Sequence, residues 1–425
     1  MLSTRDILGP EGRIAQRLTG YEHRREQLEM AQAVERAIAN GRHLMVEAGT
    51  GVGKSFAYLV PAILAVAGKT PEDKPPRRVL VSTHTISLQE QLIHKDIPFL
   101  KSVIPTPFNA VLAKGRGNYV SLRRLHNATQ RAGGLFSTEE EYEQLRTLIE
   151  WAKQTEDGSL ADLDFKPLPA IWDEVKSDAG NCMGRKCPNY GQCLYYRSRK
   201  ELQDAQVMIV NHALLFTDLA LRRNNVRLLP DYDIVVFDEA HTMEAVAGDH
   251  LGLRITSGQV DWVLRKLYND RTNKGLLVGK GGMAEEQRLV DECRHRADDF
   301  FSTLVEYQKA NESQNGRVRR PPEVANPLSE GLIALSGMVR KAGKNLTDPT
   351  QVQDFNAAAN RLKSIADETQ QWMKQEIADA VYWIDDVVAR RWRRVELAAA
   401  PIDVGPALRE QLFDQVKSVI MTSAT

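Results

Sequence analysis

A glycine-rich stretch, Glu47–Ser55 (EAGTGVGKS), has the residue types that bind phosphate. Its glycines allow a tight backbone turn whose N–H groups can face phosphate oxygens. A helix predicted to begin near Lys54 would add the positive end of its dipole. In such a loop the lysine reaches the β- and γ-phosphates and the serine ligates Mg²⁺. A strand before the loop and a helix after it disfavour the alternative of an ordinary turn. We predict an ATP–Mg²⁺ site at Ala48, Gly49, Thr50, Gly51, Val52, Gly53, Lys54 and Ser55, with Ala48 in the place of the first glycine.

A second stretch, Val235–His241 (VVFDEAH), ends an apolar run in two carboxylates. Asp238 would hold Mg²⁺, mainly through water, and Glu239 would orient and deprotonate the attacking water, as phosphoryl transfer requires. An Asp-Glu pair alone is more often a solvated turn, but a phosphate loop in the same sheet favours the catalytic role. His241 is either a hydrogen-bonded structural residue or a sensor of the γ-phosphate through Glu239.

Five short apolar runs predict buried strands of one parallel sheet. Continuous apolar character, without alternation, is expected when helices cover both faces of a sheet. The first two runs are followed closely by helical patterns, as in βαβ units. The predicted fold class is therefore α/β, with strands at Leu44–Val46, Val79–Ser82, Val207–Val210, Ile234–Phe237 and Val419–Thr422.

The spacing of these strands predicts two inserted domains. The stretches between the second and third strands, and between the fourth and fifth, are too long to be loops without their own fold. The second insert places Val260, Val263, Leu264 and Leu267 on one helical face. We predict a nucleotide-binding domain made of residues 1–110, 204–250 and 396–425, interrupted by a cysteine-containing insert at 111–203 and a helical insert at 251–395.

Composition sets broader limits. A chain of 425 residues favours two or three domains, and its 56 basic residues balance 56 acidic ones. Bulk charge therefore gives no indication of a nucleic-acid partner, and any such site must be a local patch. The N-terminal stretch lacks the apolar segment of a signal peptide, and no run approaches the roughly 18 apolar residues of a membrane span. We expect a cytoplasmic protein with no membrane partner.

Three of the four cysteines lie close together, at Cys182, Cys187 and Cys193. In a chain without an export signal, clustered cysteines bind metal more often than they form disulfides. The basic and tyrosine residues around them suit single-stranded DNA, because phosphates meet cations and bases stack on rings, although a charge run is usually a solvated face. These residues are Lys114, Arg116, Tyr119, Arg123, Arg124, Arg185, Lys186, Tyr195, Tyr196, Arg197, Arg199 and Lys200. The run Arg390–Arg394 (RRWRR) has a similar composition.

Taken in order, the motifs resemble those of superfamily 2 iron–sulfur DNA helicases, in the DinG branch that is related to XPD. They are AGTGVGKS, VSTHTISLQEQL, VNHALL, DEAH and TSAT, together with YEHRREQLEMAQAV near the N-terminus and KGRGNYVSLRRL before the cysteines. The resemblance covers essentially the whole chain. It implies a RecA-like P-loop domain that is interrupted by an iron–sulfur domain and by a helical arch, in the places of the two predicted inserts.

The resemblance also implies roles for residues outside the phosphate loop. Gln27 and its neighbour Arg24 match the adenine-side motif, although Arg25 stands where a proline is common. Further positions match elements that contact the DNA backbone or that couple hydrolysis to DNA movement. These positions are Thr83, Thr85, His241, Ser423 and Thr425.

In this family four cysteines hold a [4Fe–4S] cluster, and the three clustered cysteines match three of them. The fourth position is occupied by Ser121. A serine hydroxyl is a hard ligand that stays protonated, whereas four thiolates form the usual shell. Three interpretations stay open: a cluster with another group on its fourth iron, a three-iron or zinc site, or loss of the cluster. Cys293 lies on an apolar helical stripe, so we predict a buried structural cysteine there.

We therefore expect the N-terminal portion of an ATP-dependent DNA helicase, with 5′–3′ polarity as the resemblance implies. Its cofactors would be ATP, Mg²⁺ and a possible [4Fe–4S] cluster, and its partners would be single-stranded DNA and DNA junctions, with a monomer favoured. A Q-x-x-G-R-x-x-R motif is not found, so the arginines of a second RecA-like domain are expected outside this chain. The alternatives are a single-stranded-DNA-binding ATPase module that does not unwind DNA, and a nuclease, an activity of some relatives.

Overall fold

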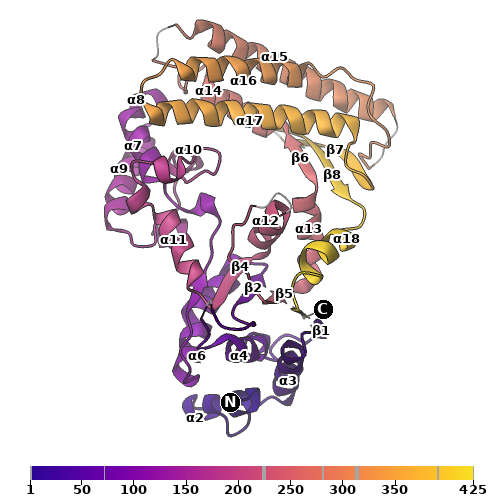
Figure 1. The fold of residues 1–425 in the computed structure, drawn as a ribbon. Helices are drawn as coiled ribbons and strands as arrows, with labels where there is room; N and C mark the ends of the chain where they lie inside the picture. Colours follow the sequence, from indigo (N-terminus) through magenta and orange to yellow (C-terminus); the bar gives the residue numbers. More distant parts are fainter. Residues whose placement is uncertain are drawn as a thin grey trace. The chain divides into compact units, whose positions relative to one another are not determined.

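The computed structural model describes residues 2–70, 72–222, 226–279, 282–311, 315–389 and 392–424. The chain divides into two compact units (Figure 1). Unit 1 comprises Met1–Gly115, Ser198–Leu251 and Asp403–Thr425, and unit 2 comprises Arg116–Arg197 and Gly252–Ile402. Unit 1 is thus assembled from three separate stretches of sequence.

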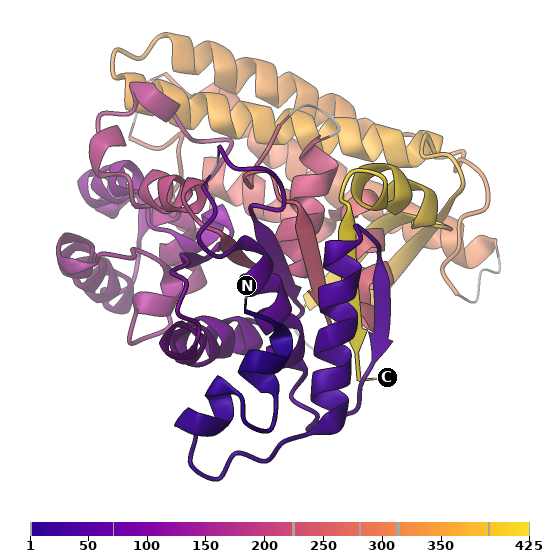
Figure 2. The same ribbon diagram turned by 60° about the horizontal axis from the view of Figure 1, so that its bottom comes forward.

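Unit 1 contains a six-stranded sheet in which every neighbouring pair of strands is parallel. All five predicted strands are present, but the first, predicted to be buried, lies at the sheet edge, and its Met45 is 77% exposed. The sequence missed β3, which has three residues and lies at the sheet edge, where a short strand gives little apolar signal. In spatial order the strands are β1 (Leu44–Glu47), β9 (Ser418–Ser423), β5 (Ile234–Asp238), β2 (Val79–Thr83), β4 (Val207–Asn211) and β3 (Ala110–Leu112). Figure 2 shows β9, near the C-terminus, beside β1.

Helices cover both faces of this sheet, which explains the unbroken apolar runs. Val79 and Val81 of β2 pack into one hydrophobic cluster, and Leu80 between them packs into the other. The first cluster includes residues of α1 (Thr4–Leu8), α2 (Arg13–Arg17), α3 (Arg25–Ala39), α4 (Lys54–Val66) and α6 (Ile97–Val103), and α5 (Ile86–Gln91) precedes α6. The second includes residues of α12 (His212–Arg222), α13 (Met243–Leu251) and α18 (Gly405–Leu408).

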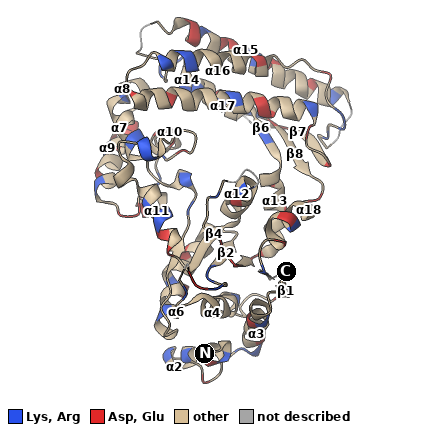
Figure 3. Ribbon diagram, in the orientation of Figure 1, with Lys and Arg blue, Asp and Glu red and all other residues tan. Residues whose placement is uncertain are grey.

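Unit 2 has two hydrophobic clusters of its own. The smaller lies among α7 (Leu122–Gln130), α8 (Ala132–Leu135), α9 (Glu139–Gln154) and α10 (Pro169–Val175), and α11 (Leu194–Gln203) leads back into unit 1. The larger lies among α14 (Ser257–Leu267), α15 (Ala284–Ala310), α16 (Pro327–Lys344) and α17 (Pro349–Lys374). The predicted apolar face of α14 is buried here. Figure 3 shows Lys and Arg interspersed with Asp and Glu along the long helices of this unit.

The sequence predicted that the second insert is helical, but the structure shows that it is not purely so. It also contains an antiparallel sheet of β6 (Leu253–Thr256), β8 (Trp392–Pro401) and β7 (Ala380–Ala389), in that order. Because β8 pairs with both neighbours, residues 396–402 fall in unit 2, whereas the sequence had assigned them to the nucleotide-binding domain. Among the residues that the structure describes, no helix has the length and apolar character needed to cross a bilayer.

Candidate nucleotide-binding site and cysteine site

The glycine-rich loop follows β1 and ends where α4 begins at Lys54. Gly53 has a left-handed backbone with φ of 85°, which favours glycine. A Cβ atom at this position would lie 2.1 Å from Nε2 of Gln27, far inside contact distance. Gln27 is buried, and its Nε2 donates a hydrogen bond of 2.9 Å to the carbonyl oxygen of Gly53. The glutamine predicted to lie on the adenine side is therefore fixed against the loop.

The loop is accessible, and its lysine is folded back onto it. Gly49, Thr50 and Gly51 are exposed. Lys54 Nζ donates to the carbonyl oxygen of Ala48 at 3.1 Å, and a bound phosphate would have to compete for this ammonium group. Arg24, predicted to lie near the adenine, forms an exposed ion pair with Glu22.

Asp238 ends β5 and is held from two sides. Its side chain accepts hydrogen bonds from Tyr58 Oη at 3.0 Å and from Thr422 Oγ1 at 3.2 Å. Burial raises the pKa of the Asp238 carboxyl, while these two hydrogen bonds and the charge of Lys54 oppose the rise. Tyr58 is fully buried, and burial together with the Asp238 charge raises its pKa well above the ordinary value. Tyr58 therefore remains a hydrogen-bond donor to the carboxylate.

The residues after Asp238 turn sharply. Glu239 has a left-handed backbone with φ of 58°, which is uncommon for a residue other than glycine. The Nδ1 atom of His241 lies 2.9 Å from Ser423 Oγ and 3.4 Å from Glu239 Oε2. The histidine of this turn therefore contacts both the second carboxylate and the last strand of the sheet.

The strand order explains how segments so far apart in sequence meet. The strands β1, β9 and β5 are adjacent, so the phosphate loop, the TSAT segment and the acidic turn all follow the carboxyl ends of neighbouring strands. The Ala48 N–H donates to the Ser423 carbonyl oxygen at 2.9 Å, and Tyr58 links the helix of the loop to the acidic turn. Thr425 lies outside the described residues.

Sequence reasoning missed Tyr58 and Thr422, the two side chains that support Asp238. A signal for Tyr58 was present, because it follows Lys54 by four residues and the two therefore share a helix face. Thr422 lies in the TSAT strand, but its partner depends on the pairing of Thr422 with Asp238 across β9 and β5. That pairing is not readable from local sequence.

The predicted DNA-contacting residues differ in their burial and in the unit to which they belong. Thr83 is fully buried and donates to the Thr85 carbonyl oxygen, while Thr85 is exposed and its hydroxyl caps α5. Lys114 lies in unit 1, whereas Arg116 and Tyr119 lie in unit 2. Tyr119 is only 1% exposed, so its ring is core and not a free stacking surface. The Arg116 guanidinium stacks on the Tyr195 ring at 3.8 Å from its centroid, and that ring is also buried.

The three clustered cysteines and Ser121 line one small cavity of about 30 Å³. Although burial opposes it, hydrogen bonds from the Gly184 N–H and from Arg116 hold the pKa of the Cys182 thiol below its ordinary value. Burial raises the pKa of Cys193. The Ser121 hydroxyl accepts from the Arg124 N–H and caps α7, a role that serine performs well.

These donors do not form a complete four-thiolate shell, because only three thiols line the cavity and Ser121 stands at the fourth position. In the part of the chain that the structure describes, no group of three or more His, Cys, Asp and Glu side chains is arranged to hold a metal ion. Cys293, as predicted, is a buried core residue of α15, and burial raises its pKa to about 12.

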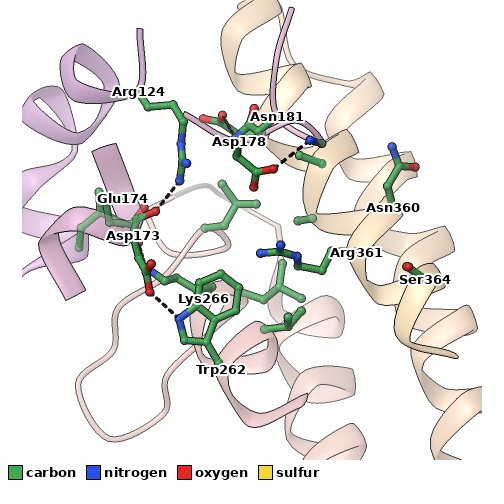
Figure 4. A pocket seen from close by; sticks show the side chains of 18 of the residues that line it. Arg124, Asp173, Glu174, Asp178, Asn181, Trp262, Lys266, Asn360, Arg361 and Ser364 are labelled. Atoms are coloured by element: carbon green, nitrogen blue, oxygen red, sulfur yellow. Dashed lines mark hydrogen bonds and ion pairs between the residues drawn. The ribbon is translucent and has the colours of Figure 1, made fainter. Parts of the chain in front are cut away.

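A larger cavity of about 440 Å³ lies within unit 2, between the cysteine-containing segment and the long helices (Figure 4). Its walls are held by polar contacts: Trp262 Nε1 donates to Asp173 at 3.1 Å, and Lys266 pairs with Glu174. The Arg361 guanidinium lies 5.1 Å from the centroid of the Trp262 ring. Cations and carboxylates both line this cavity, so its charge favours neither an anionic nor a cationic ligand.

The parallel sheet, with a glycine-rich loop after β1 and an acidic turn after β5, defines an α/β protein consistent with a RecA-like fold. Two helicase families match the sequence: DEAD/DEAH box helicase over residues 28–156, and DEAD_2 over residues 178–260. The motif-based recognition is confirmed: DEAD/DEAH-box and DEAD_2 helicase domains match the chain, and relatives named YoaA and DinG match most of it, which is consistent with a DinG-type helicase.

Three relatives illustrate the similarity. A protein named ATP-dependent DNA helicase YoaA from Haemophilus influenzae is 35% identical, and its namesake from Escherichia coli (strain K12) is 30% identical; in both cases 99% of this chain matches. A protein named 3'-5' exonuclease DinG from Bacillus subtilis (strain 168) is 26% identical over 98% of this chain and 47% of its own length. The chain spans 62% of the length of the two YoaA relatives.

Proposed function

We propose that this chain forms the nucleotide-binding part of an ATP-dependent DNA helicase. The observation that carries the proposal is the hydrogen bond from Tyr58, on the helix that begins with Lys54, to Asp238. It brings a phosphate-type loop and an acidic turn together. Lys54 would contact the β- and γ-phosphates, Ser55 and Asp238 would hold Mg²⁺, and Glu239 would orient the attacking water.

The DNA partner of the proposal rests on the relatives, two of which are named ATP-dependent DNA helicases. The contact between His241 and Ser423 supports a route by which the TSAT segment responds to the acidic turn. The 5′–3′ polarity, DNA junctions as substrates, a monomeric state and a cytoplasmic location are further parts of the proposal. Strand displacement on duplexes with a 5′ or a 3′ tail tests the polarity.

The test of the nucleotide site is equilibrium binding of a non-hydrolysable ATP analogue with Mg²⁺. Lys54→Ala should weaken binding strongly, because it removes the only side-chain cation that the motif assigns to the phosphates. Lys101→Ala, an exposed lysine on α6, is the matched control and should bind normally. Equal affinity of the wild type and Lys54→Ala would reject the site.

Turnover separates the roles of the two motifs. In the full-length protein with single-stranded DNA, Glu239→Gln should retain binding of the ATP analogue but lose hydrolysis, because the amide cannot take a proton from water. Lys54→Ala should lose both. If Glu239→Gln hydrolyses ATP at the normal rate, Glu239 does not activate the water.

Two other functions are distinguished by direct assays. A single-stranded-DNA-binding ATPase module would bind DNA in a salt-dependent manner and hydrolyse ATP, but would not displace strands. A nuclease is favoured by one relative, which is named an exonuclease. Cleavage of end-labelled DNA in Mg²⁺ tests this activity, and its absence would remove the nuclease from consideration.

For the cysteine site we propose metal binding by Cys182, Cys187 and Cys193. The fourth ligand position, where Ser121 stands, would lack a thiolate. The cavity that these three thiols share supports this. Iron, sulfide and zinc analysis of anaerobically purified protein distinguishes a cluster, a zinc site and an empty site. Ser121→Cys should raise the iron content if only a fourth thiolate is lacking. No iron or zinc in either protein would mean that the thiols are packing residues.

A further inference from the structure

The larger cavity of unit 2 has the size and the lining of a site for a small planar ligand. Its volume of about 440 Å³ lies within the range of about 300–1,000 Å³ that is usual for ligand sites. Apolar side chains of three helices line it, among them Trp262 of α14, Ala128 of α7 and Ile365 of α17. Because cations and carboxylates both line the cavity, the part of a ligand that enters it should carry no net charge.

One aromatic ring is fixed in the wall of this cavity. Trp262 Nε1 donates to Asp173 at 3.1 Å, and this hydrogen bond holds the indole plane in place. Two cations lie over the ring, the Arg361 guanidinium at 5.1 Å from its centroid and the Lys266 ammonium at 5.3 Å. Lys266 is also bound to Glu174, so a carboxylate fixes its position. The close view shows Arg361 reaching from α17 toward the indole (Figure 4).

Arg361 has no second partner of that kind. It is exposed, and in the part of the chain that the structure describes its guanidinium forms no hydrogen bond or ion pair. The side-chain amide of Gln259, another exposed residue of the lining, makes no hydrogen bond to a described residue either. A guanidinium plane stacks on heteroaromatic rings, and an amide pairs with the edge of a base. Both groups are therefore available to a ligand.

We propose that this cavity binds a nucleobase, stacked between the Trp262 ring and the Arg361 guanidinium, with the Gln259 amide at its edge. A nucleobase is planar and uncharged near pH 7, and its edge carries hydrogen-bond donors and acceptors. Stacking on an aromatic ring suits every base, because each has a π face. The base can belong to a free nucleoside or to single-stranded DNA, whose phosphates would stay outside the exposed rim. The DNA source rests on the proposed function.

A photochemical crosslink locates the base. Protein bound to an oligo-dT strand in which one thymine is replaced by iodouracil is irradiated, and the crosslinked peptide is identified by mass spectrometry. We expect attachment in the peptide that contains Trp262. A pyrimidine is used because adenine would also bind the predicted adenine-side residues of unit 1. Crosslinks confined to peptides that do not line the cavity would overturn the proposal.

Competition distinguishes the two sources of the base. If excess thymidine abolishes the crosslink in the Trp262 peptide, the cavity accepts a free nucleoside. If that crosslink persists in excess thymidine, the base belongs to the strand. Both results support a nucleobase site, whereas a wild-type protein that binds neither thymidine nor oligo-dT would reject it.

Substitutions measure the contribution of each stacking partner to the affinity for a short oligo-dT. Trp262→Ala should weaken binding about 5- to 150-fold, the factor that corresponds to about 1–3 kcal/mol for one stacked base. Arg361→Gln should weaken it about 2- to 5-fold, because a cation over a ring at an exposed site contributes less. Since Arg361 is exposed, this variant keeps the test valid if Trp262→Ala does not fold. Trp383→Ala, at a half-buried tryptophan of β7 that contacts Asp385, is the matched control and should bind normally.

The outcomes separate this inference from the proposed function. If the wild type does not bind the ATP analogue, the proposed function fails. If it binds the analogue and oligo-dT, but Trp262→Ala and Arg361→Gln bind oligo-dT as tightly as the wild type, only the assignment of the cavity fails. Weaker oligo-dT binding together with unchanged thermal unfolding and unchanged affinity for the analogue supports the inference, because a structural defect would alter the unfolding as well.

Discussion

The hydrogen bond between Tyr58 and Asp238 gives the most direct test of the nucleotide site. Tyr58→Phe removes one hydroxyl group from a fully buried ring and leaves its shape unchanged. The carboxylate then loses a donor at 3.0 Å and retains Thr422 Oγ1 at 3.2 Å and the Glu239 N–H at 3.1 Å. The substitution thus removes one hydrogen bond from a carboxylate that keeps two other hydrogen-bond donors.

The size of the effect follows from the kind of bond that is lost. A hydrogen bond to a charged group contributes about 1.5–3 kcal/mol. Because two donors to Asp238 remain, we expect the lower end, about 1.5 kcal/mol, which is roughly a tenfold change in an equilibrium constant. Loss of a partner that orients a metal-binding carboxylate typically weakens metal affinity about 10- to 100-fold, which agrees with this estimate.

The assay is the Mg²⁺ dependence of ATP-analogue binding. Tyr58→Phe should need about tenfold more Mg²⁺ for half-maximal binding than the wild type. Tyr382→Phe is the matched control, because Tyr382 is another buried tyrosine whose hydroxyl contacts backbone groups in unit 2. An unchanged Mg²⁺ requirement in a folded Tyr58→Phe protein would refute the reasoning that Tyr58 orients a magnesium ligand.

Three further predictions concern stability. Arg123→Ala should cost about 1.5–3 kcal/mol in urea unfolding, because Asp354 loses a charged partner but keeps the amide donors of Asn127 and Asn181, and an unchanged free energy of unfolding would contradict this. Gly53→Ala should destabilise unit 1 and weaken ATP-analogue binding, because its left-handed φ and Gln27 leave no room for a methyl group; unaltered binding would be inconsistent with this. Burial raises the pKa of Cys293 to about 12, so the folded state favours its neutral thiol, and the corresponding stability is lost as pH rises above 9. Between pH 9 and 10 the wild type should lose about 1 kcal/mol more than Cys293→Ala in thermal unfolding, and parallel pH profiles would disprove the assignment.

The sheet was predictable largely because its inner strands are buried on both faces. The residues around Val81 alternate between two hydrophobic clusters, so no polar residue interrupts the run. The glycine-rich loop between β1 and α4 was predictable for a different reason, since glycines and a lysine at fixed spacing favour a turn between a strand and a helix. The antiparallel sheet of unit 2 could not be predicted, because β6 is only four residues long and pairs with a strand far along the chain.

The side chains that orient the residues of the candidate site could not be predicted from the sequence, for a related reason. Tyr58 and Thr422 each donate a hydrogen bond to Asp238 from a different segment, and only the tertiary fold brings these segments together. Local sequence indicates which residues carry chemistry, but the side chains that orient them are specified by tertiary pairing. The same limit applied to the tyrosines near the cysteines, because composition suggested stacking whereas Tyr119 is buried.

The placement of β9 between β1 and β5 has a consequence for how the site would respond to its ligands. Through this one strand, Ser423 contacts both the phosphate loop, at the Ala48 N–H, and His241 of the acidic turn, while Thr422 holds Asp238. A shift of β9 along its axis would therefore change the support of the Asp238 carboxylate and the position of the loop together. Because parallel ladders on both sides resist such a shift, we expect the response to come from side-chain rotations at the carboxyl end of β9, where Ser423 is less buried than Thr422.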